Sequence, residues 1–112
     1  MKDKDKIILK KIIGYIDDVA QFVSGLDFDS FLTDKKTLSA CAFAVSQMGE
    51  IAKEISEDTQ NSHRTIPWKS IRGMRNKIVH DYEGIMLTIV WDVLDEFIPE
   101  LIVNIDKITE DL

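Results

Sequence analysis

Apolar side chains recur at helical spacing along most of the chain, and few residues interrupt them. The 112 residues include only two prolines and five glycines, which leaves little room for the turns that many short strands would need. Hydrophobic residues make up 45% of the sequence and charged residues 30%, as in soluble globular proteins. We therefore expect an all-α fold, and the length predicts a single domain over residues 1–112.

The apolar spacing divides the chain into helices with short connections. The first helix is expected over residues 5–24, where Gly25 is suited to end it. Residues 26–34 read as a connector in which Thr33 or Asp34 caps the next helix. That second helix is expected over residues 35–58, with Cys41 on its apolar stripe as a small buried residue.

The second half of the chain contains both prolines. Residues 57–63 are polar and predict a mobile loop, after which Pro67 suits the first turn of a third helix that ends near Val79 or His80. The last apolar segment, residues 85–108, contains Pro99, which should divide it into one helix up to about Phe97 and another after it. The pattern predicts an antiparallel bundle of four to five helices.

Several classes of protein fit the sequence poorly. Lys10 and Lys11 interrupt the apolar N-terminal stretch that a signal peptide would need, and no apolar run approaches the ~20 residues of a membrane span. One cysteine cannot form an intramolecular disulfide. We therefore expect a cytoplasmic protein that is not attached to a membrane.

The charges are distributed unevenly. The formal net charge is −6, yet no acidic residue lies between His63 and His80. This segment contains both histidines and five of the 14 basic residues, namely Arg64, Lys69, Arg72, Arg75 and Lys77. A basic segment on an acidic protein is typical of an anion-binding site, although each cation could instead pair with an acid of a neighbouring helix.

The third helix combines apolar and polar residues in an unusual way. On a helical wheel Arg75 falls within the apolar arc of Ile71 and Met74, so its charge needs an acidic partner or a position at a cleft or interface. Arg72, Asn76 and His80 follow at four-residue spacing as a polar stripe beside that arc. A histidine can move protons near neutral pH, and an arginine can stabilise a charged phosphorane. These residue types suit RNA cleavage by its own 2′-hydroxyl without a metal or another cofactor, and the sequence offers no ligand set with the spacing of a metal site.

The segment PWKSIRGMRNKIVHDY resembles the signature of the HepT-like branch of the HEPN superfamily, whose motif is arginine, four to six residues, histidine, one residue and tyrosine. The similarity extends upstream to AVSQMGEIAKEIS and downstream to VWDVLDEFIPEL, and so covers nearly all of the chain after the first helix. The motif in this sequence departs from the family pattern at no position.

The resemblance implies a helical homodimer in which the motif helices of two subunits face each other. It also implies a metal-independent endoribonuclease that acts as the toxin of a toxin–antitoxin pair. Its antitoxin would be a minimal nucleotidyltransferase that transfers AMP to the motif tyrosine. In this sequence the catalytic residues would then be Arg75 and His80, and Tyr82 would be the modified residue.

The resemblance also suggests supporting roles. Asn76, Arg72 and Lys69 would assist substrate binding, whereas Glu50 and Trp68 match family positions for which we expect structural roles. Trp68 and Tyr82 could stack on unpaired bases. Two alternatives remain: a non-catalytic subunit that presents nucleotide or substrate to a partner nucleotidyltransferase, and a plain dimeric bundle in which the motif has no function.

Overall fold

A computed structural model describes the backbone of residues 1–84 and 87–109 and the side chains of residues 1–76 and 90–108. All of its regular elements in these ranges are helical, which confirms the predicted all-α fold. In chain order they are α1 (Asp3–Val23), α2 (Phe28–Thr33), α3 (Lys35–Ala52), α4 (Glu57–Ser62), α5 (Trp68–Gly84), α6 (Leu87–Asp92), the π-helical turn η1 (Val93–Phe97) and α7 (Ile98–Thr109).

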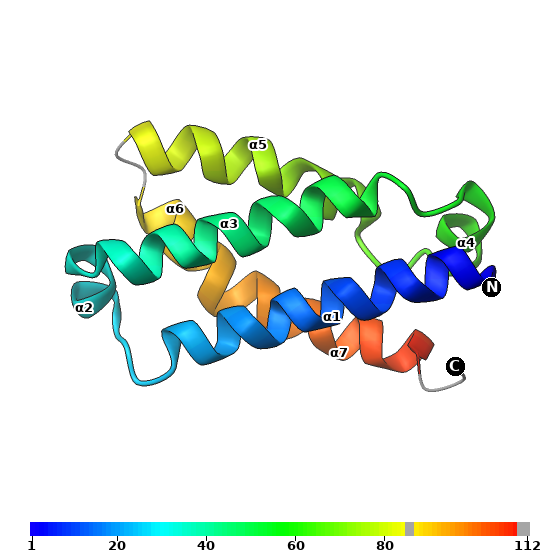
Figure 1. Ribbon diagram of the computed structural model, residues 1–112, viewed down its shortest axis with the longest axis horizontal. Helices are drawn as coiled ribbons and strands as arrows, with labels where there is room; N and C mark the ends of the chain where they lie inside the picture. The colour runs from blue at the N-terminus through cyan, green and yellow to red at the C-terminus, as the bar shows by residue number, and fades with distance from the viewer. Residues whose placement is uncertain (85–86, 110–112) are drawn as a thin grey trace.

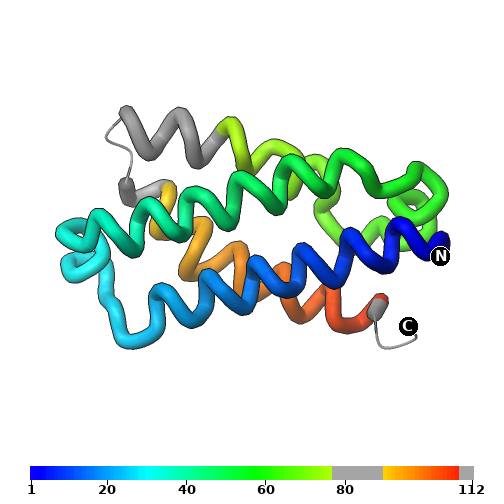
Figure 2. Tube along the Cα trace, in the orientation of Figure 1, coloured from blue at the N-terminus to red at the C-terminus, as the bar shows by residue number. Residues whose placement is uncertain are grey.

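Each long helix runs antiparallel to the long helix before it, in a bundle of 42 × 25 × 19 Å (Figure 1). Helix α3 packs against both α1 and α5, and these are the two most extensive contacts between described helices. The segment from α6 to α7 crosses behind them and contacts α1 along α7. Figure 2 shows that the start of α1 and the end of α7 lie at the same end of the bundle.

The apolar stripes of the helices meet in one buried cluster. Its largest members that are almost fully buried are Phe31, Leu9, Ile12, Met48, Ile66, Ile71, Leu101 and Ile105. Phe31 also packs against Trp91 with ring centroids 4.9 Å apart, which fastens the short helix α2 to α6. Cys41 is buried in the same cluster, and burial raises the pKa of its thiol to about 11.

Two short helices occupy segments that the sequence analysis assigned to connections. The connector over residues 26–34 contains α2, because the carboxylate of Asp27 accepts a hydrogen bond from the backbone N–H of Ser30 at 2.8 Å and caps the helix. Asp34 caps α3 in the same way, as expected, with the N–H of Thr37 at 3.0 Å. Gly25, which was predicted to end the first helix, lies two residues after α1 and adopts a φ of 78°, the left-handed conformation that glycine takes at helix ends.

The predicted helix over residues 35–58 ends earlier, at Ala52, and the predicted loop over residues 57–63 contains helix α4. Ser56 caps α4 by accepting from the N–H of Thr59 at 3.3 Å, and Glu57 and Asp58 lie in the first turn, where the helix dipole favours acidic residues. The loop was predicted because the segment is polar. A capping serine followed by two acidic residues is, however, also a typical start of a helix.

Helix α5 continues to Gly84, so the expected end near Val79 or His80 was wrong. All three motif residues of the sequence analysis, Arg75, His80 and Tyr82, are therefore within the helix.

Pro99 divides the last helical segment as predicted, but the division is a π-helical turn and no loop separates the two parts. Proline has no N–H to donate to a carbonyl four residues earlier. Before it, the N–H of Ile98 donates to the carbonyl of Val93, five residues back, which widens the helix over Val93–Phe97. In the described ranges, no helix has both the length and the apolar character of a membrane span.

Candidate active site

The candidate site lies where α3 and α5 approach closely, and a glycine makes that approach possible. A Cβ atom placed on Gly49 would lie 3.1 Å from both the backbone nitrogen of Arg75 and the carbonyl oxygen of Ile71. Such distances are tighter than ordinary carbon contacts, so any larger residue would push the helices apart. Gly49 therefore brings the next residue, Glu50, within reach of the arginine on α5.

Arg75 forms an ion pair with Glu50. The guanidinium Nε lies 3.1 Å from Oε1 of Glu50, and that same oxygen lies 3.0 Å from Nζ of Lys53. The side chains of Arg75 and Glu50 are 49% and 42% exposed, so the pair lies at the surface and contributes only about 0–1 kcal/mol to stability. The acidic partner expected from the helical wheel is thus present within the chain, and its main effect is to orient the guanidinium.

Asn76 accepts a hydrogen bond at Oδ1 from Nη1 of Arg75 at 3.3 Å. Glu50 and Asn76 therefore occupy Nε and one N–H of Nη1. Among the residues with described side chains, none accepts from Nη2 of Arg75. Within the described side chains, Nη2 and the second N–H of Nη1 therefore have no acceptor, and this edge of a guanidinium can bind an oxyanion with two parallel hydrogen bonds.

Arg72 lies one turn before Asn76 and is held differently. Its Nη1 donates to Oε1 of Gln60 on α4 at 2.8 Å, and Nε2 of Gln60 donates to the carbonyl of Ile55 at 3.0 Å. The side chain of Arg72 is partly buried, and its partner is a neutral amide.

Helix α4, which carries Gln60, is anchored by a buried carboxylate. Asp5 is 1% exposed and accepts hydrogen bonds from the N–H and hydroxyl of Ser56 at 3.0 and 2.6 Å and from the hydroxyl of Thr59 at 2.7 Å. Burial alone would raise the pKa of the Asp5 carboxyl, but these hydrogen bonds outweigh it and hold the pKa below 3.8, its ordinary value. The first turn of α1 therefore fixes the position of α4.

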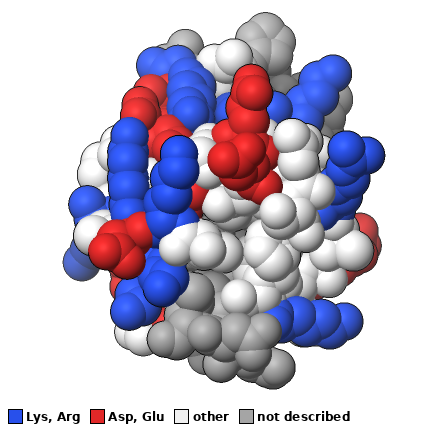
Figure 3. Space-filling view, turned by 90° about the vertical axis from the view of Figure 1, so that its right-hand side faces the viewer, with Lys and Arg blue, Asp and Glu red and all other residues white. Residues whose placement is uncertain are grey.

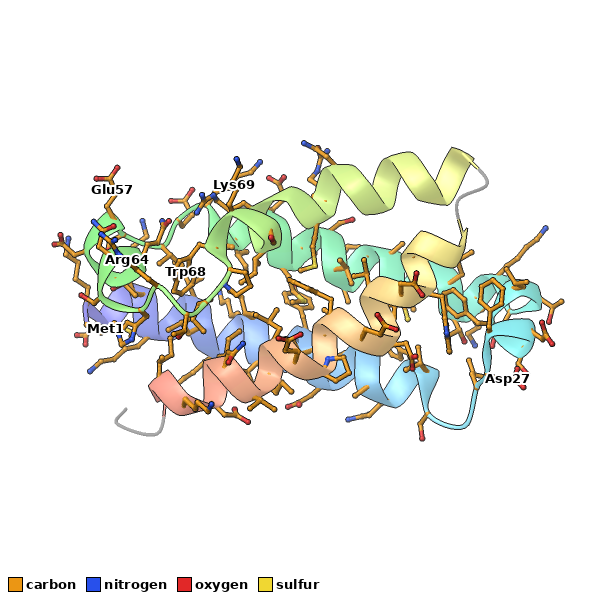
Figure 4. The ribbon with its side chains drawn as sticks, turned by 180° about the vertical axis from the view of Figure 1, so that it is seen from behind. Met1, Asp27, Glu57, Arg64, Trp68 and Lys69 are labelled. Carbon is orange, nitrogen blue, oxygen red and sulfur yellow. The ribbon has the colours of Figure 1, made fainter. Side chains whose placement is uncertain are left out.

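The two remaining residues at the start of α5 point in different directions. Trp68 is 7% exposed and donates from its indole Nε1 to the carbonyl of His63 at 3.0 Å, so it packs in the core and does not present its ring to a ligand. Figure 4 shows Trp68 between the start of α5 and α1, whereas Lys69 points outward from the bundle. Lys69 is exposed, as is Arg64 in the preceding connection.

The structure brings Arg72, Arg75 and Asn76 together on α5, with Glu50 beside them. The side chains of His80 and Tyr82 lie outside the described residues, and only their helical backbone is described. Gln60, Gly49 and Asp5 were not identified from the sequence. Gly49 and Glu50 stand together in the GE pair of the second helix, but their contact with α5 depends on how the helices cross.

Cations and carboxylates share the end of the bundle that carries α4. Figure 3 shows lysine and arginine side chains spread over this end with aspartate and glutamate among them. Among the described residues, no three His, Cys, Asp or Glu side chains gather as a metal site would require. The chemistry that the described part of the site offers is the binding of oxyanions by two arginines, one paired with a carboxylate and one with an amide.

Comparison with known proteins finds matches to ribonucleases by two routes, a family model and individual relatives. The family model described as "Ribonuclease HepT-like" matches residues 12–108. The chain is 34% identical over 113 residues to the protein named "Putative RNase MJ0127" of Methanocaldococcus jannaschii, covering 100% of this chain and 93% of the relative. It is also 34% identical over 108 residues to "Probable ribonuclease HepT" of Thermococcus cleftensis, covering 96% of this chain and 98% of the relative.

A third relative, "Putative RNase TTE0752" of Caldanaerobacter subterraneus, is 29% identical over 102 residues, which are 91% of this chain and 91% of the relative. No solved structure matches the chain significantly.

Proposed function

The chain belongs to the HepT-like ribonuclease family, and on that premise we propose that it is a metal-independent endoribonuclease. Arg75 and His80 are its catalytic residues. The observation that carries the proposal is the geometry of Arg75, whose side chain is half exposed and oriented by Glu50, and whose Nη2 has no acceptor among the described side chains and could bind a phosphate.

The reaction follows from these two residue types. The 2′-hydroxyl of the RNA attacks the adjacent phosphorus, so that a 2′-O–P bond forms and the bond to the 5′-oxygen breaks. His80 moves the proton between the attacking hydroxyl and the leaving oxygen, and Arg75 stabilises the charge on the phosphorane. The products are a 2′,3′-cyclic phosphate and a 5′-hydroxyl, and no metal is required.

Cleavage of single-stranded RNA by the purified protein in EDTA tests this function. We expect a 2′,3′-cyclic phosphate in the parent protein, and loss of cleavage in His80→Ala and in Arg75→Ala, with an unchanged helical circular dichroism spectrum. Cleavage that depends on a divalent metal, or full activity of His80→Ala, would contradict the proposal.

We further propose that the chain is the toxin of a toxin–antitoxin pair and that Tyr82 is its regulatory site. A cognate minimal nucleotidyltransferase would transfer AMP to Tyr82: the phenol oxygen attacks the α-phosphorus of ATP and pyrophosphate leaves. The added bulk and negative charge two residues from His80 would compete with the RNA phosphate. Mass spectrometry after co-expression with the neighbouring nucleotidyltransferase should find AMP on Tyr82 and none in Tyr82→Phe. An unmodified Tyr82 in a fully neutralised complex would contradict this regulation.

We also propose that the active form is a homodimer in which two basic segments meet. Each segment between His63 and His80 carries five Lys and Arg and no acid, so their meeting would concentrate positive charge on an otherwise acidic protein. Sedimentation equilibrium should give twice the 12.8 kDa mass of the chain, whereas an active monomer would contradict the proposal.

A further inference from the structure

The two arginines of the site have partners of different charge. Glu50, a carboxylate, pairs with Arg75, whereas the amide oxygen of Gln60 accepts from Arg72. An amide can fix a guanidinium without neutralising it. No carboxylate within the described side chains lies within 4 Å of Arg72, so none of them compensates its positive charge.

Gln60 is itself held in place, so it can hold another residue. Its Nε2 donates to the carbonyl of Ile55, which turns Oε1 toward Arg72. Helix α4 is in turn fixed by the buried carboxylate of Asp5 through Ser56 and Thr59. A chain of hydrogen bonds thus connects the core to the guanidinium of Arg72.

Arg72 also stands in a row of cations. Lys69, Arg72 and Arg75 follow at three-residue spacing on α5, where such neighbours have Cβ atoms about 5–6 Å apart. If an extended RNA strand runs along α5 and places one phosphate at Arg75, a neighbouring phosphate of that strand can lie at Arg72.

We propose that Gln60 is a positioning residue that holds Arg72, with its charge intact, against an RNA phosphate next to the one that is cleaved. The proposal rests on the proposed ribonuclease function and deepens it. It assigns to α4 a role in substrate binding.

The test measures binding of a labelled single-stranded oligoribonucleotide by fluorescence anisotropy, in EDTA and in a His80→Ala background so that the RNA stays intact. Gln60→Glu keeps the shape of the side chain but neutralises Arg72. We expect the affinity for RNA to fall on the order of tenfold at 0.1 M salt. A plot of the logarithm of the association constant against the logarithm of the salt concentration has a negative slope, and we expect this slope to become less steep by about one per chain. Arg72→Gln should have the same effect on the slope.

Asn61→Asp is the matched control, because it adds the same charge at the next residue of α4, where the side chain is exposed. We expect it to leave the slope unchanged. Gln60→Ala should weaken RNA binding in the parent. It should cause no further loss of affinity in the Arg72→Gln variant, because Gln60 is proposed to act only through Arg72.

Three results would overturn the inference while leaving the ribonuclease function intact. Gln60→Glu could bind RNA as tightly as the parent, or Asn61→Asp could lose as much affinity as Gln60→Glu. Gln60→Ala could also lose as much affinity in the Arg72→Gln background as it does in the parent. A parent protein that neither binds nor cleaves RNA would instead contradict the proposed function, and the inference with it.

Discussion

At Arg75, the surface carboxylate of Glu50 pairs with Nε of the guanidinium, Asn76 accepts from Nη1, and no described side chain accepts from Nη2. Such a pair adds little to the free energy of unfolding, because both side chains are about half exposed. Its contribution is therefore expected in the geometry of the site, where a displacement of about 1 Å can cost a large factor in rate.

Glu50→Gln tests this separation of stability from activity. We expect the midpoint of urea unfolding to remain nearly unchanged, with a change in free energy of about 1 kcal/mol or less. We expect kcat for RNA cleavage to fall about tenfold or more, because the guanidinium loses its orienting charge. Lys53→Gln, which removes the other cation on the same oxygen of Glu50, is the control and should retain activity.

The carboxylate of Asp5 makes stability depend on pH in a defined direction. Its pKa in the folded protein lies below its ordinary 3.8, so the stability it contributes is fully present above that value and is lost as the pH falls through the folded pKa. Asp5→Asn should lower the free energy of unfolding at pH 7 by about 1–3 kcal/mol, since a buried acceptor is replaced by a donor. Urea titrations at pH 7 and pH 3 should show the difference between parent and variant shrinking at the lower pH. A constant difference would contradict this assignment.

At the scale of elements, the contact between α3 and α5 decides where the site forms. The backbone of α5 passes so close to Gly49 that a methyl group cannot be accommodated without movement. This crossing places Glu50 beside Arg75.

Gly49→Ala should therefore destabilise the protein by about 1–3 kcal/mol and reduce cleavage along with it. Gly14→Ala is the matched control, because Gly14 lies in helix α1 with nothing within 4 Å of its added Cβ. That substitution should stabilise the fold by up to about 1 kcal/mol. Urea unfolding of the two variants measures both effects, and equal changes in the same direction would contradict the close packing of α3 on α5.

The helices that the sequence predicted best are those with a clear apolar stripe. The long helices, the cap at Asp34, the left-handed Gly25 and the interruption at Pro99 followed from local rules. The short helices α2 and α4 were missed, because six residues carry too little periodicity and their caps resemble turn residues. In the candidate site, the helical spacing predicted that Arg72, Arg75 and Asn76 would lie near one another on one helix, and their roles stay predictions. The partners of the two arginines depend on tertiary contacts between Glu50 and α5 and between α4 and α5, which no local pattern contains.

At the scale of the whole molecule, one buried cluster joins all the long helices, so we expect the fold to be lost in a single transition. Cys41 lies in that cluster and is the only cysteine of the chain. It can therefore report on the integrity of the core.

Alkylation of Cys41 at pH 8 should be slow in the native protein, because the thiol is buried and its pKa is raised to about 11. Its rate should rise with urea in parallel with the loss of helical circular dichroism. Rapid, complete labelling without urea would show that the core opens independently of the rest.

The hydrogen bonds of Asp5 join residues 51 and 54 positions apart in the chain. On a ribosome that adds about 5–20 residues per second, Asp5 waits about 3–10 s before Thr59 has even been made. Because α1 and α4 precede α5 in the chain, the supports of the phosphate-binding face proposed for α5 are synthesised before the face itself.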